Sequence, residues 1–189
     1  MTTPENVRRE LLKALYSTER LAHLYKKTSY YSEQPIRKFI DQMWNMVETG
    51  HHPDDKSTSD THSYLNSENI PEEEDCDGED LAGLPFISAV SLLISYLKTN
   101  DPSHLMHIRS GIEASSIDEL VIEDLSKDTD KSVVLITEEI SKKAELHPLT
   151  KRFREQLDVD NRKAGTIDLT SNEIISSKTG STDDITTFT

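Results

Sequence analysis

The stretch LAGLPFISAVSLLISYLK, residues Leu81–Lys98, decides the fold class of this 189-residue chain. Its apolar residues recur three and four positions apart, which places them on one face of a helix, and others lie on a second side. The first set is Phe86, Ala89, Val90, Leu93 and Leu97, and the second is Ile87 and Ile94. A helix that is apolar nearly all round is expected at the centre of a bundle. Its apolar part, Leu84–Leu97, is shorter than the about 20 residues that a membrane span needs.

Helical periodicity and start signals recur along the rest of the chain. Thr3 before Pro4, Ser32 before Pro35 and Asp101 before Pro102 each combine a capping residue with a proline suited to a first helical turn. Gly50 is a natural helix end. Ser116 to Glu119 reads as a capping box, and Pro148 opens a last helix that carries Leu149, Phe153 and Leu157. The sequence therefore predicts an all-α, single-domain bundle of about six to eight helices over residues 1–164.

Residues 132–145 allow two interpretations. Val133–Ile136 has the composition of a strand, whereas Ile136, Ile140 and Ala144 continue at helical spacing. The longer pattern favours a helix.

An acidic segment interrupts the apolar pattern. Residues 48–84 contain twelve carboxylates and one Lys, so their net charge is 1 − 12 = −11, most of the chain's −14. Low hydrophobicity and high charge predict a long loop over 48–80, mobile over 51–77, and the Ser/Thr/Asp-rich residues 165–189 are predicted to be a disordered tail.

The acidic run within that loop is the candidate partner-binding site. It consists of Glu72, Glu73, Glu74, Asp75, Asp77, Glu79 and Asp80. Such a run either stays solvated or meets a basic partner. Net negative charge disfavours nucleic acid and anionic membranes, because their phosphates are repelled. The N-terminus lacks the pattern of a signal peptide, which favours a cytoplasmic protein. The oligomeric state stays open.

Other candidate sites are weaker, and neither a catalytic residue nor a cofactor nor a metal is predicted. Cys76 lies among carboxylates, which disfavour the thiolate that a nucleophile needs. A loop holds metal-ligand residue types, but their spacing matches no ligand pattern, so a solvated loop is favoured. These are His51, His52, His62, Asp54, Asp55 and Asp60. Tyr25, Tyr30, Tyr31 and Trp44 suit an interface or the core; the core is favoured, with Trp44 against the Leu81–Lys98 helix.

Three blocks of sequence resemble the YjaG-like family of small helical bacterial proteins of unknown function. The first is Ala14–Val47, with Glu19-Arg20, Tyr25 and the helix Ile36–Trp44; the second is Ile70-Pro71, acids, then Pro85–Ala89; the third is His147-Pro148-Leu149. The resemblance spans roughly residues 10–165 and implies an all-helical, single-domain cytoplasmic protein with no accepted enzymatic activity. Residues 126–140 depart from the family pattern, and its final helix is not recognisable after Gly165.

These observations favour a non-enzymatic, protein-binding adaptor or regulator. One alternative is an immunity protein that neutralises a basic bacterial toxin such as a nuclease, because complementary charge speeds association. Another is an enzyme, which would require buried titratable residues converging on a cavity.

Overall fold

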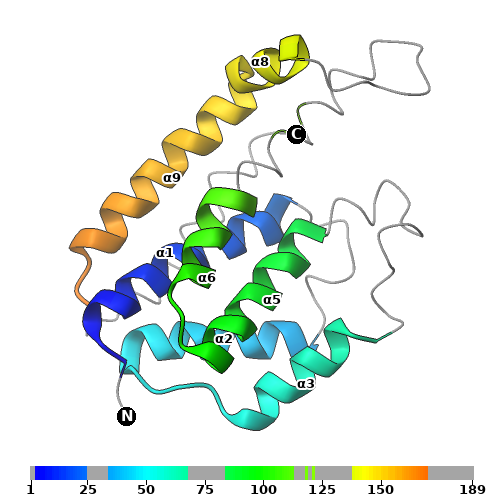
Figure 1. Ribbon diagram of the computed structural model, residues 1–189. Coiled ribbons are helices and arrows are strands. Elements are labelled where there is room, and N and C mark those ends of the chain that lie inside the picture. The colour runs from blue at the N-terminus through cyan, green and yellow to red at the C-terminus, as the bar shows by residue number, and fades with distance from the viewer. Residues whose placement is uncertain are drawn as a thin grey trace.

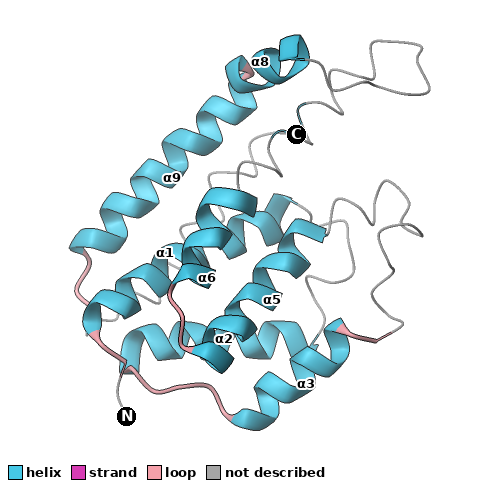
Figure 2. Cartoon of the chain, viewed as in Figure 1, coloured by secondary structure: helices cyan, strands magenta, loops and turns pink. Residues whose placement is uncertain are grey.

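Regular structure is helical throughout the described residues, which are 3–24, 34–67, 84–112, 118, 121 and 138–169 (Figures 1 and 2). A computed structural model shows a single all-α domain, as the sequence predicts. The helices are α1 (Glu5–Leu24), α2 (Gln34–Thr49), α3 (Asp55–Leu65), α5 (Leu84–Thr99), α6 (Ser103–His107), the π-helical turn η3 (Ile108–Ile112), α8 (Glu138–Leu146) and α9 (Pro148–Thr166).

Helix α1 is the centre of the bundle. It packs against α2, α5, α6, η3 and α9, and every residue from Ala14 to Ala22 is buried. The central position was predicted for the Leu81–Lys98 helix, and that prediction is wrong. Helix α5 buries Phe86 and Leu93 but leaves Ser88 and Ser91 exposed. Because Ser88 and Ser91 are small and polar, the side of α5 that carries them can face solvent although the rest of the helix is apolar.

Hydrogen bonds link the end of helix α2 to Thr3, near the start of the chain. Helix α2 buries the predicted stripe of Ile36, Phe39, Ile40, Met43 and Val47, together with Trp44 and Met46. Gly50, with φ 74°, ends the helix in the left-handed region that glycine adopts without strain. Rather than capping α1, the Thr3 hydroxyl donates to the Gly50 carbonyl oxygen at 3.2 Å. The first residues of the chain are thereby tied to the end of α2.

Helix α3 corrects the prediction of one long loop over residues 48–80. Asp54 caps this helix, since its Oδ1 accepts a hydrogen bond from the Ser57 N–H at 2.6 Å. Only Ser57 and Thr61 are buried, and the Thr61 hydroxyl donates to the Pro35 carbonyl oxygen at 2.9 Å. Helix α3 packs against α2 and α5 (Figure 1). Its two buried residues are polar, and the only apolar side chains it packs against the core are Tyr64 and Leu65 at its C-terminal end, so hydrophobic periodicity gave no sign of a helix.

The C-terminal elements agree with the sequence in part. Helix α8 confirms the helical interpretation from Glu138 onward, and α9 begins at Pro148 as predicted. Helix α9 ends at Thr166, and Ile167 and Leu169 are buried in the core, so residues 165–169 belong to the packed domain and not to the predicted tail. Figure 1 shows α9 along one side of the bundle, with its first residues next to α8, far from α2 and α3.

Several predicted features fall outside the described residues. They are the Ser32 cap, Tyr25, Tyr30, Tyr31, Cys76, the capping-box residues Ser116 and Glu119, and the segments 68–83 and 170–189.

Candidate functional site

The strongest polar constellation of the described residues lies in the core, around Glu19 on α1. The Glu19 side chain is 2% exposed and receives Arg37 Nη1 at 3.0 Å and Nη2 at 3.3 Å. Trp44 Nε1–H donates to the same carboxylate at 3.0 Å, and the Trp44 ring meets Tyr16 edge-on, with centroids 5.6 Å apart. Trp44 is thus buried, as predicted, but these contacts are with α1 and not with the Leu81–Lys98 helix.

Arg20, the next residue on α1, forms a second buried ion pair. Its Nε donates to Asp160 Oδ2 at 2.5 Å and its Nη2 donates to Asp160 Oδ1 at 2.8 Å. The two side chains are 1% and 7% exposed. A two-point contact between a guanidinium and a carboxylate fixes both distance and orientation. This pair therefore attaches α9 to the central helix in one register.

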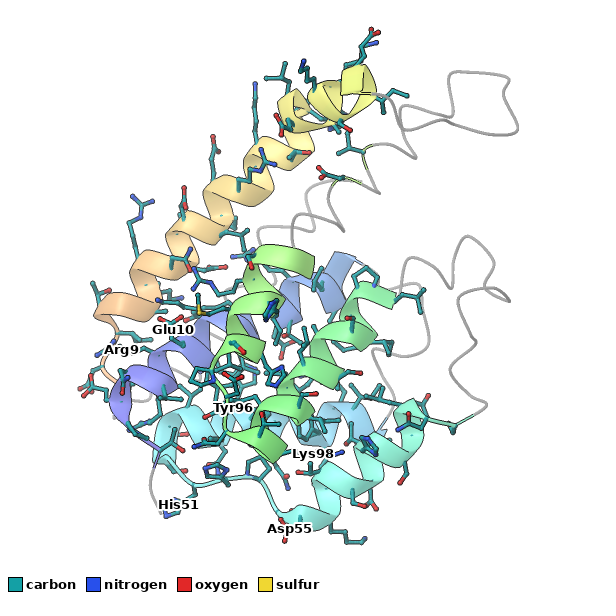
Figure 3. The ribbon with its side chains drawn as sticks, in the orientation of Figure 1. Arg9, Glu10, His51, Asp55, Tyr96 and Lys98 are labelled. Carbon is teal, nitrogen blue, oxygen red and sulfur yellow. The ribbon has the colours of Figure 1, made fainter. Side chains whose placement is uncertain are left out.

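The N-terminal turns of α1 hold two other helix ends. Arg9 Nη1 donates to the carbonyl oxygens of Ala164 at 2.9 Å and Ile167 at 3.2 Å, at the end of α9. Arg8 donates to the carbonyl oxygens of Val47 at 2.6 Å and Glu48 at 2.5 Å, at the end of α2. The last carbonyls of a helix lack intrahelical partners and carry its negative dipole end, so cations are favoured there. Figure 3 shows Arg9 beside the end of α9.

The chemistry of this network is structural. Both oxygens of Glu19 accept hydrogen bonds from Arg37 or Trp44, and both oxygens of Asp160 accept them from Arg20. A general base must come within reach of a substrate proton, whereas the side chains of Glu19 and Asp160 are only 2% and 7% exposed and are held by internal donors. The network fixes the positions of α2 and α9 on α1.

The exposed surface of α9 is unusually basic. We call this surface the basic face. Its exposed residues are Lys151, Arg152, Arg154, Glu155, Asp158, Val159, Arg162 and Lys163. Five cations against two carboxylates give 5 − 2 = +3, in a chain whose net charge is −14. Lys163 Nζ also lies 5.8 Å from the centroid of the Tyr16 ring.

The loop residues considered for a metal do not converge. The Asp54 carboxylate serves as the cap of α3 and accepts from Gln42 Nε2 at 2.6 Å, and these two hydrogen bonds, from Ser57 first, lower the Asp54 pKa below its usual value. Asp60 lies 3.7 Å from Lys56 Nζ. His51 and Asp55 lie apart in Figure 3, and no cluster with metal-ligand geometry exists among the described residues.

The predicted partner-binding run is outside the described residues, so its geometry stays a prediction. Three acids that precede the run are described by the structure. Asp54, Asp55 and Asp60 are exposed on α3. The basic face was missed by the sequence reasoning. The spacing of residues 151, 154, 155, 158 and 162, opposite the apolar Leu149, Phe153 and Leu157, was the available signal, since positions three and four apart share a helix face.

The fold defines the class: an all-helical bundle whose central helix carries buried ion pairs. A structure with the same fold is that of a DUF416 family protein from Shewanella baltica OS155, with a TM-score of 0.67 and 12% sequence identity. The alignment covers 94% of this chain and 89% of that chain. No protein-family profile and no curated protein matches the sequence. The likeness supports the expected relation to an uncharacterised helical family at the level of the fold; the narrower YjaG-like assignment stays a prediction.

A membrane-spanning role finds no support in the helices themselves. Of those in the described part of the chain, none combines the length and the apolar character that crossing a bilayer requires.

Proposed function

We propose that this protein is a non-enzymatic module that binds another protein and acts as an adaptor or regulator. The observation that carries the proposal is the concentration of charge, −11 over residues 48–84 of a chain with net charge −14. Such a field steers encounter with a basic partner and selects against acidic ones.

The described start of this segment supports the proposal. Asp54, Asp55 and Asp60 lie at the solvent surface of α3, whereas the packed face of α3 uses Ser57 and Thr61. Helix α3 therefore presents carboxylates on a folded support directly before the acidic run. In contrast, the ionic groups in the core, Glu19 and Asp160, are each neutralised by an arginine. The buried carboxylates stabilise the helix packing, whereas the exposed carboxylates are accessible to a partner.

The partner is a protein with a cationic surface. A basic toxin neutralised by an immunity protein is one case of this chemistry, and the adaptor role is the other. A gene for a toxin domain directly upstream would favour immunity.

The test measures association rates with the native partner, isolated by affinity capture. Changing Glu72, Glu73 and Glu74 to Gln is expected to lower the on-rate at low salt, and changing all seven acids of the run to amides should lower it further. Each exposed pair contributes only about 0–1 kcal/mol, so the effect comes from the summed field. The off-rate changes less, because it depends on buried contacts.

A matched control removes the same number of charges elsewhere. Glu5, Glu139 and Glu145 are exposed on α1 and α8, and their triple Glu→Gln variant alters net charge as much as the triple Glu→Gln variant of the run. If the run is the docking site, the control variant keeps the faster on-rate. Equal on-rates for all variants at low and high salt would leave the run a solubility loop.

A further inference from the structure

Three cations of the basic face of α9 have no ion-pair partner among the described residues. Lys151, Arg154 and Arg162 are exposed and form no ion pair with any residue in the described part of the chain. Two carboxylates lie one turn away on the same helix, Glu155 from Lys151 and Asp158 from both arginines, at the four-residue spacing that often yields pairs. The side chains instead extend into solvent, where they are available to an external anion.

Aliphatic side chains accompany these cations. Val159 is 41% exposed within the basic face, and Leu146, 65% exposed, ends α8 next to the start of α9. Among the described residues the only other large exposed apolar side chain is Met106. Apolar anchors inside a charged rim are the usual composition of a protein–protein contact. Phosphate of a nucleic acid would meet Glu155 and Asp158 in the middle of this face.

The basic face is also held rigid from behind. The opposite side of α9 is fixed to α1 by the Arg20–Asp160 ion pair and by Arg9 at the last carbonyls of α9. A surface that is already ordered loses little conformational entropy when it binds. The cations are therefore presented along one straight helix of 19 residues, about 28 Å long at 1.5 Å per residue.

We infer that the basic face binds the acidic run of a second copy of this chain. The inference rests on the proposed function, in which the acidic run binds a basic partner, and it identifies the basic face as the surface that the run binds. The run has seven carboxylates in nine residues, flanked by Ile70 and Leu81, and so matches both the cations and the aliphatic anchors. Nine residues reach at most about 30 Å, which is enough to span the basic face, about 18 Å along α9 from Lys151 to Lys163. Each copy carries one run and one basic face, so two reciprocal contacts close a twofold dimer.

Salt screens the long-range repulsion between two chains of net charge −14 more than it weakens the short-range attraction between the run and the basic face. At about 0.15 M salt the Debye length is about 8 Å, so charges on the far sides of the two copies hardly interact. Contacting charge pairs act over a few ångströms and persist. Near 1 M salt, where the Debye length is about 3 Å, those pairs weaken as well. The dimer is therefore expected at physiological salt and dissociates at high salt.

The experiment is sedimentation velocity of the full chain over micromolar to submillimolar concentrations. The wild type should show a concentration-dependent dimer. Reversing the basic face with Lys151→Glu, Arg154→Glu and Arg162→Glu should weaken dimerisation at least about tenfold. Neutralising the seven acids of the run should do the same. The matched control, Lys38→Glu, Lys56→Glu and Lys98→Glu, changes exposed lysines outside α9 by the same charge and should dimerise more strongly than the face variant.

Mixing the two deficient variants tests the pairing itself. The face variant retains an intact run, and the run variant retains an intact face. The mixture should therefore dimerise more strongly, through one intact contact, than either variant does alone. Recovery also shows that both variants are folded. A monomeric wild type, a control as weak as the face variant, or a mixture without recovery would each overturn the inference. So would a wild type whose basic face binds single-stranded DNA but not a second copy. A monomeric wild type leaves the proposed function standing, since that function is tested by on-rates to a separate partner.

Discussion

Removing the charge of Asp160 tests whether the buried ion pair fixes α9 to α1. Asp160→Asn preserves side-chain volume and one acceptor oxygen but removes the negative charge that Asp160 places against Arg20, whose side chain is 1% exposed. Two unit charges about 4 Å apart at an effective dielectric constant of about 20 attract by roughly 4 kcal/mol. Breaking a buried pair from one side costs about 3–5 kcal/mol, because the remaining charge stays desolvated. We expect a loss near 3 kcal/mol in the free energy of unfolding.

The assay is urea unfolding, in which the midpoint falls while the slope stays constant. Asp158→Asn is the matched control, since it makes the same chemical change two residues earlier, at an exposed side chain. Its effect should stay within about 0.5 kcal/mol. Hydrogen exchange should locate the Asp160 effect, with α9 amides losing more protection than α2 amides if the helix detaches locally.

A double variant separates the pair's charge from its packing. Arg20→Met with Asp160→Leu removes both charges and should recover most of the stability lost in Asp160→Asn, because no unpaired buried charge remains. Equal midpoints for Asp160→Asn and Asp158→Asn would refute the reasoning. So would a double variant less stable than Asp160→Asn, since that would show the pair to be worth more than its desolvation.

Four further outcomes follow from single contacts. Trp44→Phe removes the donor to buried Glu19 and should cost about 1–3 kcal/mol by denaturant unfolding, while wild-type tryptophan emission stays blue-shifted; a solvent-like emission maximum would contradict the burial. Burial raises the pKa of Tyr96, whose hydroxyl has no hydrogen-bond partner among the described residues, so the contribution of Tyr96 to stability is constant below about pH 10 and falls above it. Tyr96→Phe should therefore unfold at an equal or higher midpoint and lose less stability at alkaline pH. Arg9→Met should lower the thermal midpoint and the exchange protection of the last turn of α9, and unchanged protection there would argue against the cap. The lowered pKa of Asp54 means that α3 is stabilised above pH 3.8 and loosens as pH falls through the lowered pKa, a transition that Asp54→Ala should abolish in amide exchange of α3.

The sequence by itself determined those helices in which an apolar stripe is accompanied by a local start or stop signal. The stripe of α2 with Gly50 at its end and the start of α9 at Pro148 appear as predicted. Asp101 Oδ1 does accept from the Ser103 N–H at 2.9 Å, but the cap position of α6 is Pro102 and not the predicted Asp101. Each depends on residues within a few positions of one another, so periodicity and capping rules apply without knowledge of the rest of the chain.

The tertiary structure alone decided which helix is central and which polar residues are buried. Sequence hydrophobicity pointed to α5, yet α1 occupies the centre although it carries Glu19 and Arg20, because Arg37 and Asp160 neutralise them across 18 and 140 residues of sequence. Helix α3 also depends on tertiary contacts, since the buried Thr61 hydroxyl donates to the Pro35 carbonyl oxygen at 2.9 Å and Tyr64 and Leu65 pack against the core. These buried charges are tolerated because chain folding brings a partner of opposite charge to each, and no local pattern records which distant residue supplies it.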